Sequence, residues 1–318
     1  MSTALTRIVI TGGAGFIGSH LVEYFLRSGT HVVCLDDFTS GSKQNLEFTN
    51  DSKLDLRTVD VSEGCDVDGP VDAVLHFASP ASPADYLSRP LATMRVGSLG
   101  TLNALELARR KGARLLLAST SEVYGDPQLH PQPESYWGYV NPIGPRSVYD
   151  ESKRFSEALT MTYRQQYDVD VAIVRIFNTF GPRMRHSDGR AVPTFVTQAL
   201  SGSPITISGD GSQTRSFCFI DDLVDGIVRM LRSDLVGPVN LGNPEELRID
   251  MLASLITSLT GSRSPIRFID LPVDDPKCRR PDISMARREL GWEPQVNVTD
   301  GLRRTIAWFR QHSVDSEA

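Results

Sequence analysis

Cysteine is scarce in this chain. The four cysteines, at positions 34, 65, 218 and 278 of 318 residues, lie far apart and form no CxxC pair. This spacing excludes a disulfide framework, so we expect free thiols in a reducing, cytoplasmic compartment. The six histidines show no ligand spacing either, and we predict no metal site.

Long apolar runs and an excess of basic residues are also missing. No apolar segment approaches the ~20 residues that span a bilayer, and we expect no signal peptide because no charged leader precedes an apolar stretch. The net charge is -6 at pH 7, whereas nucleic-acid-binding proteins usually carry a basic stripe. We therefore expect no membrane partner and no nucleic-acid partner. A few local arginines would still suffice to bind a small anion.

The chain does contain a regular alternation of short apolar runs and longer amphipathic stretches. The apolar runs predict strands over residues 7–11, 31–36, 71–77, 113–118 and 171–176. Helical periodicity covers residues 15–28, 91–111 and 150–167. Strands alternating with helices predict an α/β fold, in which a doubly wound parallel sheet is covered by helices on both faces.

Three glycines, Gly12, Gly15 and Gly18, stand where the first strand passes into the first helix. They permit a tight turn, the approach of a pyrophosphate and close helix–strand packing, and the helix N-terminus offers free N–H groups. Asp36 ends the second strand, where a carboxylate binds ribose hydroxyls and repels a 2′-phosphate. We predict a dinucleotide site that prefers NAD. The alternatives are a plain turn for the glycines and a solvated turn residue for Asp36.

Neighbouring positions complete the predicted cofactor site, and Asp60 and Val61 are expected to border the adenine. The other residues assigned to the cofactor are Phe16, Ile17, Asp37, Phe38, Thr39, Gly41, Phe77, Ala78 and Ser79. The chain changes character after residue 178, with a Gly-, Arg- and Pro-rich loop followed by shorter elements. We therefore predict a Rossmann NAD-binding domain over 1–178 and a smaller C-terminal substrate-binding domain over 179–318, with late segments free to return to the sheet.

Tyr149 and Lys153 are four residues apart in a predicted helix and so share one face. Tyrosine is a poor base at neutral pH unless positive charge lowers its pKa, and an ammonium together with the nicotinamide of NAD⁺ supplies that charge. Thr120 and Ser121 follow the strand 113–118, at an edge where doubly wound sheets bind ligands. We predict that Tyr149 removes a hydroxyl proton while a hydride leaves the same carbon. The alternative is a surface tyrosine beside a solvated lysine.

Taken together, these features resemble the extended short-chain dehydrogenase/reductase family over nearly the whole chain. Longer segments resemble its UDP-glucuronate decarboxylase (UDP-xylose synthase) branch, namely HFASPAS (76–82), LLLASTSEVYGDP (115–127), NPIGPRSVYDESKR (141–154), RIFNTFGPRM (175–184), NLGNPEE (240–246) and DDPKCRRPDI (274–283). The resemblance implies tightly bound NAD, a UDP-sugar substrate, and a homodimer formed through the helices 91–111 and 150–167.

The resemblance also implies a reaction. Oxidation of the sugar at C4, with Tyr149 as base, makes the C6 carboxylate a β-keto acid that loses CO₂, and the bound cofactor then re-reduces C4. Thr120 and Tyr149 hydrogen-bond the enolate oxygen. Arg279 orients the carboxylate or a reprotonating water, while Glu122 disfavours the carboxylate or positions the proton donor. Ser121 replaces the aspartate of the 4,6-dehydratases, which disfavours dehydration.

The resemblance further assigns the substrate site. Asn178 and Arg215 correspond to positions that bind the UDP diphosphate, Gln213 is expected at the ribose, and residues 205–207 at the uracil. The complete predicted substrate set is Ser79, Thr120, Glu122, Tyr149, Asn178, Arg185, Gln213, Arg215 and Arg279. The alternative for Arg215 is a surface ion pair with Asp221 or Asp222. His76 is predicted to be a packed residue.

Three positions depart from the decarboxylase pattern. Gly97 stands where the extended family has asparagine. The loss of the asparagine side chain either slows a proton relay or is compensated by Ser98. Arg185 is a carboxylate-binding feature of the UDP-glucuronate 4-epimerases, and Pro193-Thr194 replaces Ser-Asn. These departures keep the 4-epimerase as the alternative function. A non-catalytic NAD-binding protein is disfavoured because Tyr149 and Lys153 are both present.

Overall fold

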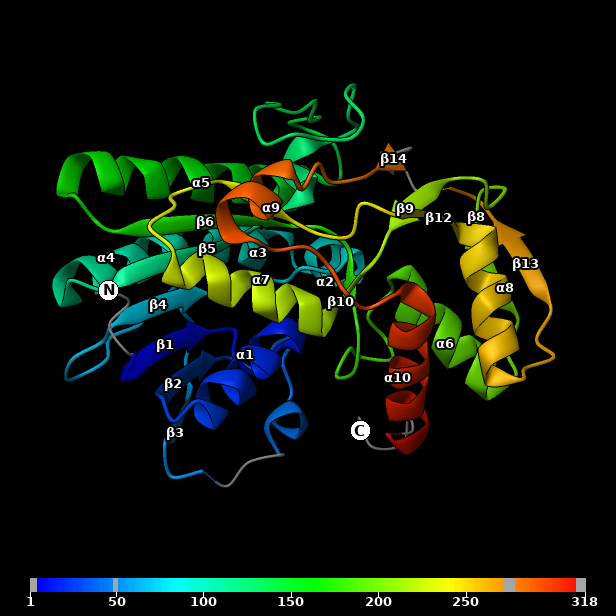
Figure 1. The fold of residues 1–318 in the computed structure, drawn as a ribbon, viewed down its shortest axis with the longest axis horizontal. Helices are drawn as coiled ribbons and strands as arrows, with labels where there is room; N and C mark the ends of the chain where they lie inside the picture. Colours follow the sequence, from blue (N-terminus) through cyan, green and yellow to red (C-terminus); the bar gives the residue numbers. More distant parts are fainter. Residues whose placement is uncertain (1–4, 48–50, 272–277, 313–318) are drawn as a thin grey trace.

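The computed structural model describes residues 5–47, 51–271 and 278–312. Its centre is a seven-stranded sheet with the strand order β11-β6-β5-β4-β1-β2-β3, in which every neighbouring pair is parallel (Figure 1). The strands are β1 (Arg7–Thr11), β2 (His31–Asp36), β3 (Leu54–Thr58), β4 (Ala73–His76), β5 (Arg114–Thr120), β6 (Val171–Ile176) and β11 (Val239–Leu241). The predicted doubly wound α/β sheet is confirmed.

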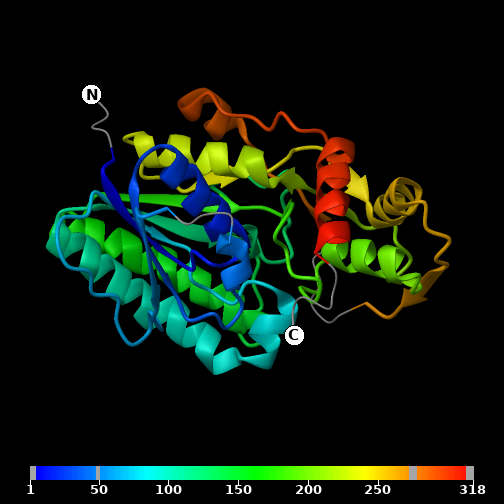
Figure 2. The same ribbon diagram turned by 90° about the horizontal axis from the view of Figure 1, so that it is seen from below.

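Helices cover both faces of this sheet (Figures 1 and 2). The helices α1 (Phe16–Arg27) and α7 (Ile220–Arg232) lie on one face, and α4 (Thr101–Lys111) and α5 (Ser147–Tyr167) lie on the other. Side chains of β1 alternate between the two layers, since Ile8 and Ile10 pack with α1 whereas Val9 packs with α4. Burial on both faces explains why the strands are continuous apolar runs in the sequence.

Most predicted elements appear where the sequence placed them. The predicted strands 7–11, 31–36 and 171–176 coincide with β1, β2 and β6. The helical stretch predicted over 91–111 is confirmed, and within it a π-helical turn, η2 (Val96–Gly100), joins α3 (Pro90–Arg95) to α4. β3 was not predicted, and β11 is a late segment that returns to the sheet beside β6.

The remaining elements surround the carboxyl edge of the sheet. Three small sheets pair β10 (Cys218–Phe219) with β7 (Thr179–Phe180), β13 (Ile266–Ile269) with β8 (Ile205–Ser208), and β9 (Thr214–Ser216) with both β12 (Glu246–Arg248) and β14 (Cys278–Arg279). The other helices are η1 (Lys43–Leu46), α2 (Pro83–Ser88), η3 (Ser121–Tyr124), α6 (Ala191–Ser201), α8 (Ile249–Thr260), α9 (Ser284–Leu290) and α10 (Val298–Gln311). Among the described residues, no helix is both long and apolar enough to cross a membrane. We propose that the NAD-binding domain ends and the substrate-binding domain begins at about residue 178.

Candidate active site

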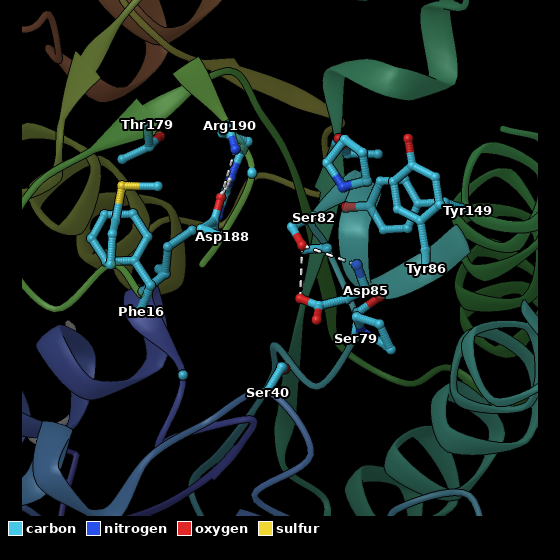
Figure 3. Close-up of a pocket in the computed structure, with 18 of the residues that line it drawn as sticks. Phe16, Ser40, Ser79, Ser82, Asp85, Tyr86, Tyr149, Thr179, Asp188 and Arg190 are labelled. Carbon is cyan, nitrogen blue, oxygen red and sulfur yellow. Dashed lines mark hydrogen bonds and ion pairs between the residues drawn. The ribbon is translucent and has the colours of Figure 1, made fainter. Parts of the chain in front are cut away.

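One cavity of about 810 Å³ lies at the carboxyl ends of the central strands and extends to β8 and β9, and Figure 3 shows part of its lining. Ligands bind doubly wound sheets at this edge. All the residues predicted for catalysis and for substrate binding line it. So do the predicted cofactor residues, except Phe38 and Gly41, which the structure does not bring to the cavity surface.

The glycine turn between β1 and α1 leaves no room for side chains. Gly12 has a φ of +70°, and a Cβ atom there would lie 2.6 Å from the backbone nitrogen of Ala78. A Cβ atom on Gly18 would lie 2.1 Å from the carbonyl oxygen of Gly12. Gly15 caps α1 without a side-chain hydrogen bond, and the first turn of α1 lines the cavity. This turn therefore offers backbone N–H groups and the positive end of a helix dipole to an anion such as a pyrophosphate.

Asp36 occupies the cavity wall at the end of β2. Its carboxylate accepts hydrogen bonds from the backbone nitrogens of Ala14 at 2.9 Å and Phe38 at 2.8 Å. Gly41 lies behind it, since a Cβ there would come within 2.8 Å of Oδ1 of Asp36. Phe38 and Gly41 thus support the carboxylate from outside the cavity. A carboxylate has about four acceptor sites, so Asp36 keeps acceptor capacity, and the turn and Asp36 together fit a dinucleotide with free ribose hydroxyls.

The first turns of α5 carry Tyr149 and Lys153 on the cavity face, and both side chains are buried. The hydroxyl of Thr120 hydrogen-bonds the Tyr149 phenol. Lys153 Nζ donates to the carbonyl of Ala118 at 2.9 Å and lies 5.9 Å from the centre of the Tyr149 ring. Burial raises the pKa of Tyr149, against smaller lowering effects from Thr120 and Arg190. Burial also lowers the pKa of Lys153 to about 8.

The expected lowering of the Tyr149 pKa is therefore not produced by the chain alone. An ionised phenol at this buried position requires further positive charge in the cavity. The position of Lys153 on the adjacent turn and its buried ammonium are consistent with a supporting role.

Glu122, in η3, lies between two arginines next to Tyr149. Its Oε2 accepts a hydrogen bond from Arg146 at 2.6 Å, and its Oε1 accepts one from Arg279, which also donates to the carbonyl of Gly125 at 3.0 Å. Burial alone would raise the pKa of Glu122, but Arg279 and Arg146 outweigh it and lower the value to about 2. Glu122 is thus a fixed anion near neutral pH. We refer to Glu122, Arg146 and Arg279 as the Glu122–arginine cluster.

The sequence did not single out Tyr86, Arg146 or Arg190. The Tyr86 ring stacks on Tyr149 with centroids 5.1 Å apart and an angle of 6°, as Figure 3 shows. Its hydroxyl is buried without a hydrogen-bond partner among the described residues, so it is available to a ligand. The Arg190 guanidinium donates two hydrogen bonds to Asp188, at 2.6 and 2.8 Å. Arg146 precedes Tyr149 by three residues, and this helical spacing would have placed the two side chains on one face. The sequence around Tyr86 contains no comparable pattern.

Two of the departures from the decarboxylase pattern have local explanations. Arg185 lines the cavity and forms an ion pair with Asp85, which also accepts a hydrogen bond from Ser82 at 2.8 Å. A Cβ atom on Gly97 would lie 2.6 Å from the Cβ of Ser152, so Ser152 leaves no space for asparagine there. The Ser98 hydroxyl donates to the carbonyl of Met94 at 2.7 Å, within its own helix, and does not replace an asparagine side chain.

At the far end of the cavity, β8 presents alternate side chains. Thr206 and Ser208 line the cavity, whereas Ile205 and Ile207 are fully buried in the core, so the predicted edge beside uracil consists of the polar residues and not of the isoleucines. Gln213 Nε2 donates to the carbonyl of Ser208 at 2.7 Å.

The structure also tests the predictions for Arg215 and His76. Arg215 lines the cavity, while Asp221 pairs with Arg304 and Asp222 accepts the backbone N–H of Val296 at 2.9 Å. His76 is buried and hydrogen-bonds Thr11 and Thr101, and burial lowers its pKa to about 3, so it is a neutral packed residue. In the described ranges, no three His, Cys, Asp or Glu side chains group as metal ligands would.

Comparison with known proteins identifies similar chains. Residues 8–242 match the sequence profile of the NAD dependent epimerase/dehydratase family. UDP-glucuronic acid decarboxylase 1 from Danio rerio is 52% identical over 304 residues, which are 95% of this chain and 72% of that protein. UDP-glucuronic acid decarboxylase 3 from Arabidopsis thaliana is 48% identical, with 93% of this chain and 86% of that protein covered.

Solved structures agree on the fold. A dTDP-glucose 4,6-dehydratase from Streptomyces venezuelae with NAD bound has a TM-score of 0.87 and 30% identity, over 96% of this chain and 97% of that one. A variant of the UDP-glucuronic acid 4-epimerase from Bacillus cereus, in complex with NAD and a fluorinated UDP-glucuronic acid, has a TM-score of 0.85 and 28% identity, over 97% of this chain and 100% of that one.

Proposed function

Since the chain belongs to the NAD dependent epimerase/dehydratase family, we propose that it is a UDP-glucuronate decarboxylase, which converts UDP-glucuronate to UDP-xylose and CO₂. The observation that carries this proposal is the Glu122–arginine cluster, which lies beside Tyr149 in the same cavity. NAD is the cofactor; the glycine turn and Asp36 would hold it, and it would supply the hydride acceptor and donor for C4 of the sugar. The net reaction consumes no reductant.

The residues around Tyr149 provide the acid–base chemistry of the first step. Tyr149 removes the proton of the C4 hydroxyl, and the Thr120 hydroxyl that already bonds the phenol is placed to bond the same substrate oxygen. The Lys153 ammonium favours the phenolate through its charge. After CO₂ leaves, Tyr149 and Thr120 hold the enolate oxygen at C4 while a water molecule delivers a proton to C5 and so restores the C4 carbonyl. Tyr149 then returns its proton to the C4 oxygen when C4 is reduced.

The Glu122–arginine cluster provides the selectivity for a carboxylated sugar. Arg279 and Arg146 line the same cavity as Tyr149, and planar guanidinium groups bind carboxylates in two-point geometry. Orientation is what decarboxylation requires, because the breaking bond must stand perpendicular to the plane of the C4 carbonyl. Glu122 repels a carboxylate that strays from the arginines, and it favours departure of the carboxyl group as neutral CO₂.

The 4-epimerase remains the second candidate because Arg185 lines the cavity, as the resemblance to UDP-glucuronate 4-epimerases implied. In this structure, however, the Arg185 guanidinium forms an ion pair with Asp85, which compensates its charge. Arg279 and Arg146 share one anionic partner, Glu122, so the three side chains of the Glu122–arginine cluster together carry a net positive charge. Dehydration stays disfavoured because Ser121 provides a hydroxyl and not a carboxylic acid.

The product of the reaction decides between these functions. UDP-glucuronate labelled with ¹³C at C6 is incubated with the purified protein and followed by NMR. We expect UDP-xylose with the label released as CO₂ and bicarbonate, NAD that copurifies with the chain, and no net formation of NADH. Label retained in UDP-galacturonate would show epimerisation and contradict decarboxylation. A 4-keto-6-deoxy sugar nucleotide cannot form from this substrate, because C6 carries a carboxylate and no hydroxyl that dehydration could expel.

We also propose a homodimer and a cytoplasmic location. Helices α3 and α5 and the turn η2 pack together and expose apolar side chains, among them Leu91, Leu99 and Phe155. Apolar faces of this kind mark interaction surfaces. The four cysteines are free thiols, which suits a reducing compartment.

A further inference from the structure

Asp150 is a buried carboxyl group that the proposed reaction does not use. It follows Tyr149 at the start of α5, is 5% exposed, and is not among the residues that line the cavity. Its Oδ1 atom is buried and has no hydrogen-bond partner among the described residues. An ionised carboxylate without hydrogen bonds is unfavourable in such a place, so burial here favours the protonated form.

The neighbours of Asp150 strengthen this preference. Glu122 is a second carboxylate close by, and it stays charged because Arg279 and Arg146 hold it. Burial, followed by the charge of Glu122, raises the pKa of Asp150 to about 7, although Arg146 and Arg279 act in the opposite direction. Other titratable groups on the surrounding elements include Tyr149, Glu151 and Lys153 on α5, and Asp85 and Tyr86 on α2. Arg95 of α3 pairs with Glu63.

We propose that Asp150 takes up a proton from solvent when a carboxylated sugar nucleotide binds beside Tyr149, and that it is in this way a positioning residue for the Glu122–arginine cluster. The inference rests on the proposed function, because a neutral sugar brings no charge to the cluster. A carboxylate that arrives at Arg279 adds negative charge near Asp150 and makes the ionised form of Asp150 less favourable. No bond of the sugar changes in this step.

Linkage gives the direction of the pH dependence. The pKa of Asp150 is higher in the complex than in the free protein, so binding is tightest where Asp150 is already protonated. Affinity for the carboxylated sugar therefore falls as the pH rises through about 7. Once Asp150 is ionised, its negative charge also competes with the sugar carboxylate for Arg146 and Arg279.

Isothermal titration calorimetry in two buffers of different ionisation enthalpy measures the proton uptake directly. The parent protein is the NAD-loaded Tyr149→Phe variant, in which UDP-glucuronate binds without turnover. We expect uptake of about half a proton per UDP-glucuronate near pH 7, and much less for UDP-glucose, which lacks the carboxylate. The Kd for UDP-glucuronate should rise by up to about tenfold between about pH 6 and about pH 8.5, which corresponds to a shift of about one pKa unit.

Variants isolate the group that titrates. Asp150→Asn, made in the same parent, mimics the protonated carboxyl and should lose the proton uptake and flatten the pH dependence, and Asp150→Ser serves as a second variant. The matched control is Glu151→Gln, which removes a charge from the next residue, whose side chain is 37% exposed and pairs with Arg154. Because the charge of Glu151 is the smallest of the influences named for Asp150, this control should still take up a proton on binding. Lys153 is present in all variants, so its own titration cancels in the comparison.

Equal proton uptake in the parent and in Asp150→Asn overturns the inference, and so does equal uptake with UDP-glucose. The proposed function fails by a different observation, namely the absence of CO₂ release from UDP-glucuronate with the unsubstituted protein. An uptake that depends on Asp150 in a protein that epimerises would sustain the inference and reject the decarboxylase.

Discussion

Among single residues, Tyr149 is the one on which the proposed acid–base chemistry depends. Tyr149→Phe removes the phenolic oxygen but keeps the ring that stacks on Tyr86. Because no other group in hydrogen-bond contact with Thr120 can take its place, turnover of UDP-glucuronate should fall at least about 100-fold. Copurified NAD, measured by the absorbance of the protein-free extract, should remain at the level of the unsubstituted protein. Substantial turnover in this variant would show that the base is another residue.

Arg279 distinguishes orientation of the carboxylate from simple binding. Arg279→Ala leaves Glu122 with Arg146 alone and removes the hydrogen bond to Gly125. The C4 hydroxyl and Tyr149 are untouched, so C4 oxidation should continue while CO₂ loss slows by about 100-fold or more. Reduced nicotinamide absorbance and a 4-keto sugar should then accumulate in a single turnover followed by stopped flow. If oxidation and CO₂ release fall by the same factor, Arg279 only binds the substrate.

At the scale of the element, sequence patterns predicted the regular pieces and missed what depends on distant contacts. β1, β2 and β6 were predicted to the residue because strands buried on both faces are continuous apolar runs. β3 is an edge strand with the polar pattern LDLRT and left no such run. The sequence around η2 has continuous helical periodicity, so it did not predict the π-helical turn. Gly97 of this turn packs against Ser152, which lies 55 residues further along the chain.

The packing of η2 against α5 can be tested through Gly97 and Ser152. Gly97→Ala places a Cβ atom 2.6 Å from the Cβ of Ser152, and such overpacking should destabilise the protein by about 1–3 kcal/mol in urea unfolding. In the background Ser152→Gly the obstructing atom is gone, so the same Gly97→Ala change should be neutral or stabilising.

A matched background separates this explanation from a general intolerance of η2. Ser152→Ala keeps the Cβ atom and removes only the hydroxyl, which donates to the Val148 carbonyl. Gly97→Ala should remain destabilising there. A cost of Gly97→Ala that is the same in the Gly and Ala backgrounds would rule out the direct contact and point to the backbone of the turn itself.

At the scale of the whole molecule, the site is assembled from segments that the sequence keeps far apart. Glu122 and Arg279 were singled out by family resemblance, but their mutual ion pair, across 157 residues, was not predicted. Tyr86 and Arg190 were not predicted as site residues, because an aromatic stack and a buried ion pair leave no periodic pattern in the sequence. Local patterns thus predict which strand ends line the cavity, whereas the partner of each charged side chain is a property of the tertiary fold.

The proposed homodimer makes a prediction for the molecule as a whole. Leu91 is 76% exposed on α3 and Phe155 is 50% exposed on α5, and these two helices pack together on one side of the sheet, which Figure 2 shows from below. Burial of this apolar surface by a second copy would drive association. A glutamate introduced into this surface would oppose association, because its carboxylate would be buried without a partner. The unsubstituted protein should therefore elute with about twice the 35.0 kDa mass of the chain when light scattering follows size exclusion. Phe155→Glu should shift it to the mass of one chain.

Met251→Glu changes a side chain of similar exposure, 55%, on α8 and should leave the larger mass unchanged. Dissociation by Met251→Glu but not by Phe155→Glu would place the interface on the other part of the molecule.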